Sequence, residues 1–528
     1  MMRKSQKKKM EKNMPAGNRA KLLKSGKSAA LISTLMLSLF LQMSCSQVST
    51  SPVRQKQVDN LTILQNSIDK ILQDSVLHRT RTGIKIVSLD RGEVLYSRDS
   101  QLLFHPASNM KLLTTATALK KLGPDYRFRN MVFADSFSIT NGGISGNLYM
   151  KGFGNPDLVT DDLEKIAANL AEKGIRFIEG NLVCDDSYFD DLFWGSGWMW
   201  DDASAWYWAP ITPLTVNDNC IELKIRPGKK LGDTVLVDMM PQTDYMGIVN
   251  KAVTVDSTDT LLLEKFKVER EWKHPQNMIV VEGGFLYTDS LDTYLIDVVD
   301  GTLYTGTLFY EILKRKGISL AGEVVRDTVP DTAVKLIEHG SLPLSLIVYN
   351  TNKISDNLSA ELILKTLGAE FKNPPGTAKK GITIINDYLH TLGIDTAAIK
   401  LADGSGVSRY NLVTADLLIE LLKDMDKDFR VQAEFKTSLP IASIDGTLKN
   451  RMKNTAAADK LRAKTGTLSG VSALSGYTVT ADGERIAFSM IMEHFVGSSS
   501  KIRKIQDKVG SVISGFSRTS TIFNPVSE

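Results

Sequence analysis

A serine and a lysine three residues apart stand where a helix is predicted to begin. The segment HPASNMKLLTTATALKKLG, residues 105–123, has Pro106 in its first turn, apolar residues at helical spacing and a glycine at its end. Residues three apart on a helix share a face, so Ser108 can present its hydroxyl to the Lys111 amine. A hydroxyl beside an amine can become a nucleophile without a histidine.

The Ser-x-x-Lys pattern is common, and this chain contains it elsewhere as well. Ser67 with Lys70 and Ser498 with Lys501 also match it, in flanking segments that predict solvated helix faces. A serine and a lysine at this spacing therefore do not identify a catalytic site by themselves. Independent motifs are needed to select one copy.

Two further short motifs carry side chains that suit the same chemistry. Ser355-Asp356-Asn357 lies between two predicted helices, and Lys464-Thr465-Gly466 directly precedes a predicted hairpin. Lys-Thr-Gly occurs once in the chain, whereas Ser145-Gly146-Asn147 is a second match to Ser-x-Asn. Of the Ser-x-x-Lys copies in the chain, only the one at Ser108 follows a predicted hairpin, starts a predicted helix and precedes both other motifs.

The elements that must position these residues lie towards both ends of the chain. The patterns predict an amphipathic helix over 61–77, a hairpin over 82–99, a second hairpin over 472–495 and a final helix over 501–516. We expect the two ends to meet in one antiparallel sheet covered by helices, which is an α+β fold. The strand-rich and turn-rich stretch over 125–292 is then an insertion.

Length and composition agree with such a division. The 528 residues suffice for two to four domains, since a domain usually holds about 100–200 residues. An apolar fraction of 42% and a charged fraction of 23% are typical of a globular protein. We expect a catalytic domain formed by 46–124 and 293–528, with one or two mainly β domains inserted over 125–292.

The N terminus is strongly basic and is followed by an apolar stretch. Ten of the first 27 residues are Lys or Arg against one acid, Glu11, which gives +9. Residues 28–46, SAALISTLMLSLFLQMSCS, are apolar and end in small residues, an order typical of a secretory signal. Subtracting +9 from the chain total of +4 leaves −5, so the rest of the chain is not basic and we exclude nucleic-acid binding. Residues 1–45 therefore predict export, to a periplasm.

The three cysteines have different expected roles. Ser44-Cys45 ends the apolar stretch and resembles a bacterial lipoprotein box, although Leu41 stands one place too early for the usual pattern. Either Cys45 is lipidated and anchors the protein to a membrane, or simple cleavage occurs nearby. In an oxidising compartment Cys184 and Cys220 form either one disulfide or two buried free thiols.

The ordered set Ser-x-x-Lys, Ser-x-Asn and Lys-Thr-Gly resembles the signature of penicillin-binding proteins and serine β-lactamases. The interval between Lys111 and Ser355 is far longer than in a simple β-lactamase. The chain thus resembles the low-molecular-mass class C penicillin-binding proteins, the D-alanyl-D-alanine carboxypeptidase/endopeptidase family, whose β-lactamase/transpeptidase-like domain carries a large insertion. Other segments that resemble the family are 146–158, 197–210, 213–228 and 403–414.

The resemblance implies a role for each motif residue. Lys111, neutral because of burial and the nearby charge of Lys464, would take the proton of Ser108, which attacks the carbonyl between two D-residues. Ser355, bridging towards Lys464, would pass a proton to the leaving amine, and Asn357 would hold the substrate backbone.

The remaining implied contacts involve the strand that starts at Lys464. Thr465, Gly466 and Thr467 would bind the substrate, with the threonine hydroxyls and Lys464 on its terminal carboxylate. The oxyanion would lie between the backbone N–H groups of Ser108 and Thr467. Asp403 and Ser405 form a tight-turn sequence that lies near the cleft in the family.

The resemblance implies an exported serine peptidase of peptidoglycan stem peptides and cross-links, with β-lactams as covalent inhibitors and with no cofactor or metal. A β-lactamase-like hydrolase is one alternative, but neither Glu361 nor Glu370 begins the Glu-x-x-Leu-Asn pattern of the deacylating glutamate. A non-catalytic protein that binds the wall or senses β-lactams is the other alternative.

Five of the six tryptophans lie within 15 residues and form a further notable cluster. Such a cluster forms either a packed domain junction, which we favour, or a platform on which sugars or peptides stack. The tryptophans are Trp194, Trp198, Trp200, Trp206 and Trp208.

Overall fold

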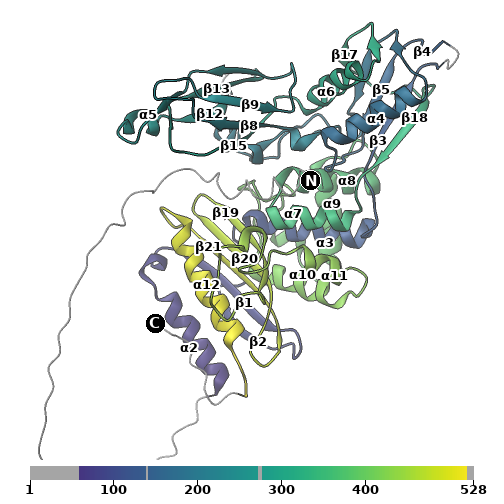
Figure 1. Cartoon of the computed structure of the whole chain (residues 1–528). Helices are drawn as coiled ribbons and strands as arrows, with labels where there is room; N and C mark the ends of the chain where they lie inside the picture. Colours follow the sequence, from purple (N-terminus) through teal and green to yellow (C-terminus); the bar gives the residue numbers. More distant parts are fainter. Residues whose placement is uncertain (1–58, 138–140, 272–275, 520–528) are drawn as a thin grey trace, which may run out of the picture.

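The computed structural model describes residues 59–137, 141–271 and 276–519. The predicted signal segment, including Cys45, lies outside these described residues. Figure 1 shows two parts: a sheet with its helices, and an inserted region joined to it beside α8 (Asn357–Lys372). Among the described helices none is both long and apolar enough to span a membrane.

The two ends of the chain form one antiparallel sheet, as predicted. Its strand order is β19-β20-β21-β1-β2, and β1 pairs with β21 over its full length. This pairing joins the N-terminal and C-terminal hairpins, so the α+β prediction is confirmed (Figure 1). The strands are β1 (Arg81–Ser88), β2 (Val94–Arg98), β19 (Arg462–Leu468), β20 (Val471–Val479) and β21 (Arg485–Glu493).

Each face of this sheet buries a different set of helices because successive strand residues point to opposite sides. Ile84 and Ile86 of β1 pack with α2 (Asn60–Leu72) and α12 (Ser499–Gly515). Val87 of the same strand packs with the helices on the other face of the sheet. Those helices are α3 (Met110–Leu122), α7 (Leu344–Ile354), α8, α9 (Ala378–Thr391), α10 (Ala415–Lys427) and α11 (Gln432–Ser438).

The predicted helix at 105–123 begins with a 3-10 turn rather than with an α-helix. Residues Ala107–Asn109 form this turn, and α3 follows from Met110. Ala107 has a φ of 47°, which turns the chain sharply just before Ser108. Gly123, with a φ of 85°, ends the helix where the sequence predicted.

The inserted region forms two lobes that share one hydrophobic core. One lobe holds the sheets β17-β7-β5-β3-β18 and β16-β6-β4, with α4 (Thr160–Glu172) and α6 (Gly301–Arg315) beside them. The other lobe holds the sheets β15-β8-β9, β10-β13-β12 and β11-β14, with α5 (Thr260–Glu264) at its end (Figure 1).

The strands of the first lobe are β3 (Arg129–Ala134), β4 (Gly143–Ile144), β5 (Leu148–Gly152), β6 (Phe177–Ile178), β7 (Leu182–Asp185), β16 (Ser319–Leu320), β17 (Val324–Arg326) and β18 (Val334–Gly340). Those of the second lobe are β8 (Cys220–Arg226), β9 (Leu236–Met240), β10 (Gly247–Asn250), β11 (Val253–Val255), β12 (Lys267–Arg270), β13 (Met278–Glu282), β14 (Gly284–Leu286) and β15 (Asp292–Asp297).

The inserted region extends beyond residue 292, where the sequence predicted its end. Strand β15 pairs with β8, β17 pairs with β7, and β18 pairs with β3. These ladders hold residues 293–340 against the inserted sheets and not against the catalytic sheet. The helical run from Gly301 is therefore α6 of the insertion, and the catalytic part resumes at α7.

Cys184 and Cys220 are both free and buried, so the disulfide interpretation is wrong and the alternative of two buried thiols is confirmed. Cys184 lies on β7 and Cys220 begins β8, and these strands belong to different sheets. Burial raises the pKa of each thiol, which keeps both in the unreactive neutral form.

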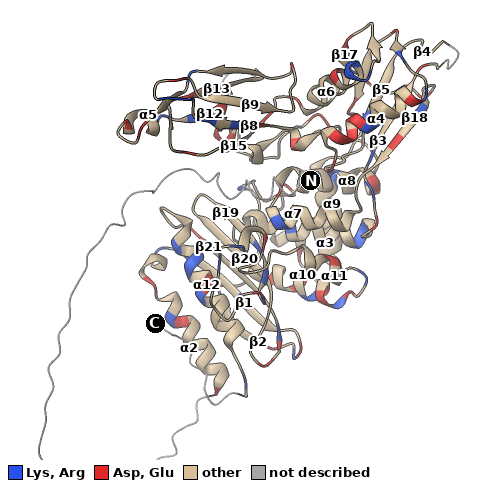
Figure 2. Cartoon of the chain, in the orientation of Figure 1, with Lys and Arg blue, Asp and Glu red and all other residues tan. Residues whose placement is uncertain are grey.

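Charges of both signs are spread over the described surface. Figure 2 shows that Lys and Arg residues are interspersed with Asp and Glu residues along the ribbon of both parts. Many of them are paired across elements, as Arg485 is with Asp90 and Arg326 with Asp300.

Candidate active site

Ser108 and Lys111 meet at the start of α3. The Lys111 Nζ lies 3.2 Å from the Ser108 Oγ. Ser108 is half-buried, whereas Lys111 has no exposed surface. A ligand can therefore reach the hydroxyl while the amine stays out of bulk water.

The amine of Lys111 has two further oxygen partners. It donates to the Asn357 Oδ1 at 2.6 Å and to the Ser405 carbonyl at 2.8 Å. Burial lowers the pKa of Lys111 to about 8, although the carboxylates of Asp403, Asp356 and Glu361 act in the opposite direction. A large fraction of the Lys111 side chains is thus neutral near pH 8, so the lysine can act as a base and no histidine is needed.

Lys464 and Ser355 form the second pair of the site. The Lys464 Nζ lies 2.9 Å from the Ser355 Oγ and 2.9 Å from the Thr465 carbonyl. Burial, and then the charge of Lys111, hold the pKa of Lys464 well below its ordinary value. The sequence predicted that burial and the charge of Lys464 would both lower the pKa of Lys111; burial is the largest cause of the lowered pKa at both lysines.

The backbone between α7 and α8 places Ser355 and Asn357 on either side of a sharp turn. Ser355 ends α7 in the left-handed conformation, with φ 64° and ψ 41°. Asp356 then begins α8, because its side chain accepts hydrogen bonds from the backbone N–H and the hydroxyl of Ser359. Ser355 thereby faces Lys464 while Asn357 faces Lys111.

Gly466 lets the edge strand β19 run close to the Ser108 turn. A Cβ at this position would lie 2.8 Å from the Pro106 carbonyl and 3.1 Å from the Ser108 nitrogen. Only glycine allows this approach without a backbone shift. Thr467 follows on the exposed side of the strand, and the Thr465 hydroxyl donates to Thr447 at 2.7 Å.

Asp403 and Ser405 belong to a buried loop that contacts Lys111. Asp403 accepts from the backbone N–H groups of Gly406 and Ser408 and from the Asn411 side chain. Glu361 of α8 accepts from the N–H groups of Gly404 and Ser405. The loop is thus a tight turn, as its composition indicated, and its Ser405 carbonyl reaches the candidate base.

The tryptophan segment (residues 194–208) lies at the junction of the two parts and touches the site. Trp198 and Trp206 pack against a cluster that contains Leu358 and Leu362 of α8, which agrees with the favoured interpretation as a packed junction. The Trp198 Nε1 also donates to Asp403 at 3.0 Å, and the Tyr207 carbonyl accepts from the Asn357 Nδ2 at 2.9 Å. No sequence pattern indicated these two contacts.

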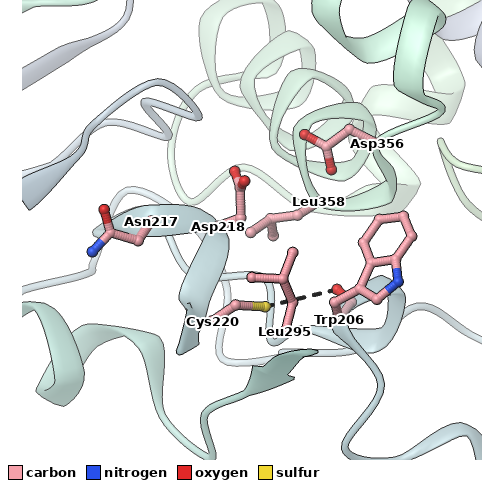
Figure 3. Close-up of a pocket in the computed structure, with 7 residues that line it drawn as sticks. All are labelled: Trp206, Asn217, Asp218, Cys220, Leu295, Asp356 and Leu358. Atoms are coloured by element: carbon pink, nitrogen blue, oxygen red, sulfur yellow. Dashed lines mark hydrogen bonds between the residues drawn. The ribbon is translucent and has the colours of Figure 1, made fainter. Parts of the chain in front are cut away.

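A small cavity lies behind the tryptophan segment at the same junction. Figure 3 shows Asp356 above it and Cys220 at its base, with the Cys220 thiol directed towards the Trp206 carbonyl. Asn217, Asp218, Leu295 and Leu358 complete its lining. Ser108 is not among the lining residues, so this cavity is separate from the reactive hydroxyl.

The Ser-x-x-Lys copies at Ser67 and Ser498 have structural roles. The Ser67 hydroxyl donates to the Ile63 carbonyl within α2, and Ser498 caps the N terminus of α12. Neither copy has the other motifs beside it. The copy at Ser108 is therefore the one that the fold combines with Asn357, Lys464 and Ser355.

The site is built for acyl transfer by an oxygen nucleophile. A partly exposed hydroxyl lies beside an amine of lowered pKa, and a second hydroxyl–amine pair can relay a proton. Across the described ranges no group of three or more His, Cys, Asp or Glu side chains is arranged to hold a metal ion.

Comparison with known proteins agrees with this geometry. Residues 64–513 match the D-Ala-D-Ala carboxypeptidase 3 (S13) family. A D-alanyl-D-alanine carboxypeptidase of Actinomadura sp. (strain R39) is 37% identical over 447 residues, which are 82% of this chain and 81% of that protein.

Two solved structures have a similar fold. Penicillin binding protein 4 (dacB) of Haemophilus influenzae superposes with a TM-score of 0.75 at 24% identity, over 85% of this chain and 99% of that chain. The same protein in complex with a β-lactam gives a TM-score of 0.68 at 22% identity, over 84% and 97%. Because the family match covers most of the chain and the Actinomadura relative matches along most of both sequences, this protein is a member of the D-Ala-D-Ala carboxypeptidase 3 (S13) family.

Proposed function

We propose that the protein is a serine-type D-alanyl-D-alanine carboxypeptidase, endopeptidase or both, acting on peptidoglycan stem peptides and their cross-links. The observation that carries the proposal is that three motifs distant in sequence meet at one partly exposed serine. Lys111 of the first motif and Ser355 of the second are 244 residues apart. The carboxypeptidase name of the Actinomadura relative supports the substrate class.

Acylation begins with Lys111 in its neutral form. Its amine takes the Ser108 proton as the Ser108 Oγ attacks the carbonyl carbon before the terminal D-residue. Its contact with the Asn357 Oδ1 at 2.6 Å and with the Ser405 carbonyl holds the amine at the hydroxyl. The new C–O bond gives a tetrahedral intermediate that carries a negative oxygen.

Backbone N–H groups of Ser108 and Thr467 would stabilise that oxygen. The close approach of β19 at Gly466 to the Ser108 nitrogen supports this assignment. One such donor is typically worth about 10²–10³ in rate. The Thr465 and Thr467 hydroxyls, with Lys464, would bind the terminal carboxylate of the substrate.

The intermediate collapses when the C–N bond breaks and the leaving amine receives a proton. Ser355 supplies it in exchange for one from Lys464, whose Nζ lies 2.9 Å away. The leaving D-residue departs, and the acyl group remains as an ester on Ser108. Water then hydrolyses the ester and restores the serine.

Slow hydrolysis of β-lactam adducts is expected because both candidate glutamates, Glu361 and Glu370, are engaged elsewhere. Glu361 accepts from two backbone N–H groups and is buried. Glu370 accepts from the hydroxyls of Tyr126 and Tyr188. This supports a penicillin-binding peptidase over a β-lactamase.

Incubation with excess penicillin tests the proposal most directly. The mature protein is expected to gain the mass of one penicillin, on the peptide that contains Ser108, and to release D-Ala from a peptide ending in D-Ala-D-Ala. Intact mass over time and D-Ala release are the measurements. An adduct lost within seconds would favour the β-lactamase alternative, and neither adduct nor release would favour the non-catalytic binding protein.

A matched pair of substitutions at Ser355 separates its hydroxyl from its backbone conformation. Ser355→Ala and Ser355→Gly are both expected to lower the acylation rate about 10²-fold, because both remove the proton relay. Ser355→Gly is expected to be about 0.5–1 kcal/mol more stable than Ser355→Ala, since glycine adopts the left-handed conformation without strain. Denaturant unfolding and penicillin acylation measure the two effects, and equal stability would show that the turn is not strained.

We further propose that residues 1–45 export the chain to the periplasm and that Cys45 carries a lipid anchor. The basic run, the apolar stretch and Ser44-Cys45 support this proposal. The mass of the mature N terminus distinguishes lipidation at Cys45 from simple cleavage at another residue.

A further inference from the structure

The two oxygen atoms that hold the Lys111 amine are each fixed by the tryptophan segment of the inserted region. The amine donates to the Asn357 Oδ1 and to the Ser405 carbonyl. The other end of the Asn357 amide, its Nδ2, donates to the Tyr207 carbonyl at 2.9 Å. This bond selects the amide orientation in which oxygen, and not nitrogen, faces the lysine.

The second oxygen is held through Asp403. Its carboxylate has no exposed surface and organises the loop that contains Ser405. The Asp403 Oδ2 accepts from the Ser408 N–H inside the loop and from the Trp198 Nε1, 3.0 Å away. Trp198 is thus a side-chain donor from the inserted region, 205 residues away in sequence, to a carboxylate that shapes the Lys111 environment.

Buried carboxylates depend on their full set of donors. Removing one donor from a buried acceptor leaves an unsatisfied group, which destabilises its surroundings by about 1–3 kcal/mol. The loop can recover by shifting or by admitting water, and either response moves the Ser405 carbonyl. A displaced amine in turn loses its alignment with the Ser108 hydroxyl.

We propose that Trp198 is a positioning residue for the reaction, which acts through Asp403 and the Ser405 carbonyl to hold Lys111 at Ser108. This proposal rests on the proposed function, because it assigns Lys111 the role of base. It explains why a segment of the inserted region packs over the N terminus of α8 and the Asp403 loop. Its indole N–H, rather than the bulk of its ring, is the group that matters.

Trp198→Phe tests the proposal because it removes the N–H and keeps an aromatic ring at the junction. The matched control is Trp194→Phe, in the same segment, where the lost indole bond goes to the Trp208 carbonyl at 3.2 Å. We expect the acylation rate constant of Trp198→Phe to fall about tenfold, while that of Trp194→Phe stays within about twofold of wild type.

Two penicillins distinguish a positioning role from contact with the ligand. Benzylpenicillin has a bulky acyl side chain, and 6-aminopenicillanic acid has none. A positioning residue lowers the maximal acylation rate constant by the same factor for both, with little change in the concentration that gives half the maximal rate. A loss confined to benzylpenicillin, or seen only as weaker binding, would overturn the proposal.

Measuring the amplitude of adduct formation together with its rate constant separates a folding defect from a slower reaction. Misfolded molecules lower the amplitude measured by intact mass, whereas the rate constant reports the competent molecules alone. Equal rate constants for Trp198→Phe and Trp194→Phe would refute the positioning role. Absence of any adduct on wild-type protein would instead refute the proposed function itself.

Discussion

Replacing Ser108 with alanine is expected to abolish both penicillin adduct formation and D-Ala release. The variant loses the hydroxyl that the Lys111 amine contacts at 3.2 Å, and with it the covalent intermediate. In serine peptidases the loss of the nucleophile lowers the rate by about 10⁴-fold or more. Folding should be unaffected because Ser108 is only half-buried and lies in a short turn.

The chain supplies its own control for this substitution. Ser67 stands in the same Ser-x-x-Lys pattern, but its hydroxyl donates to the Ile63 carbonyl within α2. Ser67→Ala should therefore acylate at the wild-type rate. Intact mass after penicillin treatment measures both variants. Retained adduct on Ser108→Ala, with peptide mapping to another serine, would contradict the assignment.

The α+β architecture could be predicted because its signals are local. Alternating apolar residues in both hairpins and helical spacing in the flanking segments determine which surfaces must be buried. Those surfaces become the two faces of the sheet, with Ile84 and Ile86 on one side and Val87 on the other. The motif residues could be proposed for the same reason, since each motif is a short run of fixed spacing.

The contacts that surround the motif residues could not be predicted, because they join distant parts of the chain. The Tyr207 carbonyl meets Asn357 across 150 residues, and Trp198 meets Asp403 across 205. A backbone carbonyl has no sequence signature at all. The tryptophan cluster suggested a junction, but composition alone does not say which carboxylate lies beneath it.

The boundary of the inserted region shows a related limit. Residues 301–315 have the spacing of an ordinary buried helix, and nothing in that pattern says which core the helix joins. The strand pairings before and after this helix determine which core it joins, since β15 pairs with β8 and β18 pairs with β3. Such pairings depend on strands far away in sequence, so a local pattern places the helix but not its partner.

Replacing Lys111 with methionine is expected to lower the acylation rate about 10²–10⁴-fold, the usual worth of a general base. Methionine has a similar length and no charge, so it fills the buried space beside Asn357 without offering a base. The pH dependence should change as well. With a pKa of about 8, Lys111 becomes neutral as the pH rises, so the wild-type rate should be half-maximal near pH 8 and level off above about pH 9.

The pH dependence of stability provides a second, independent test of the lowered Lys111 pKa. Burial lowers the folded-state pKa of Lys111 below its ordinary value of 10.5, so the unfolded chain binds the proton more tightly. Between about pH 8 and 10 the unfolded state therefore carries more protons, and the free energy of unfolding of wild type should rise relative to Lys111→Met, by about 1–3 kcal/mol. Urea unfolding across this range measures the difference.

Lys70→Met provides the control for Lys111→Met. Lys70 belongs to the α2 copy of the pattern and is exposed, so Lys70→Met should not change the acylation rate. If Lys111→Met kept the wild-type rise of acylation towards pH 8, another group would have to be the base. Lys464, whose pKa burial also lowers and whose Nζ lies 2.9 Å from the Ser355 Oγ, would then be the next lysine to replace.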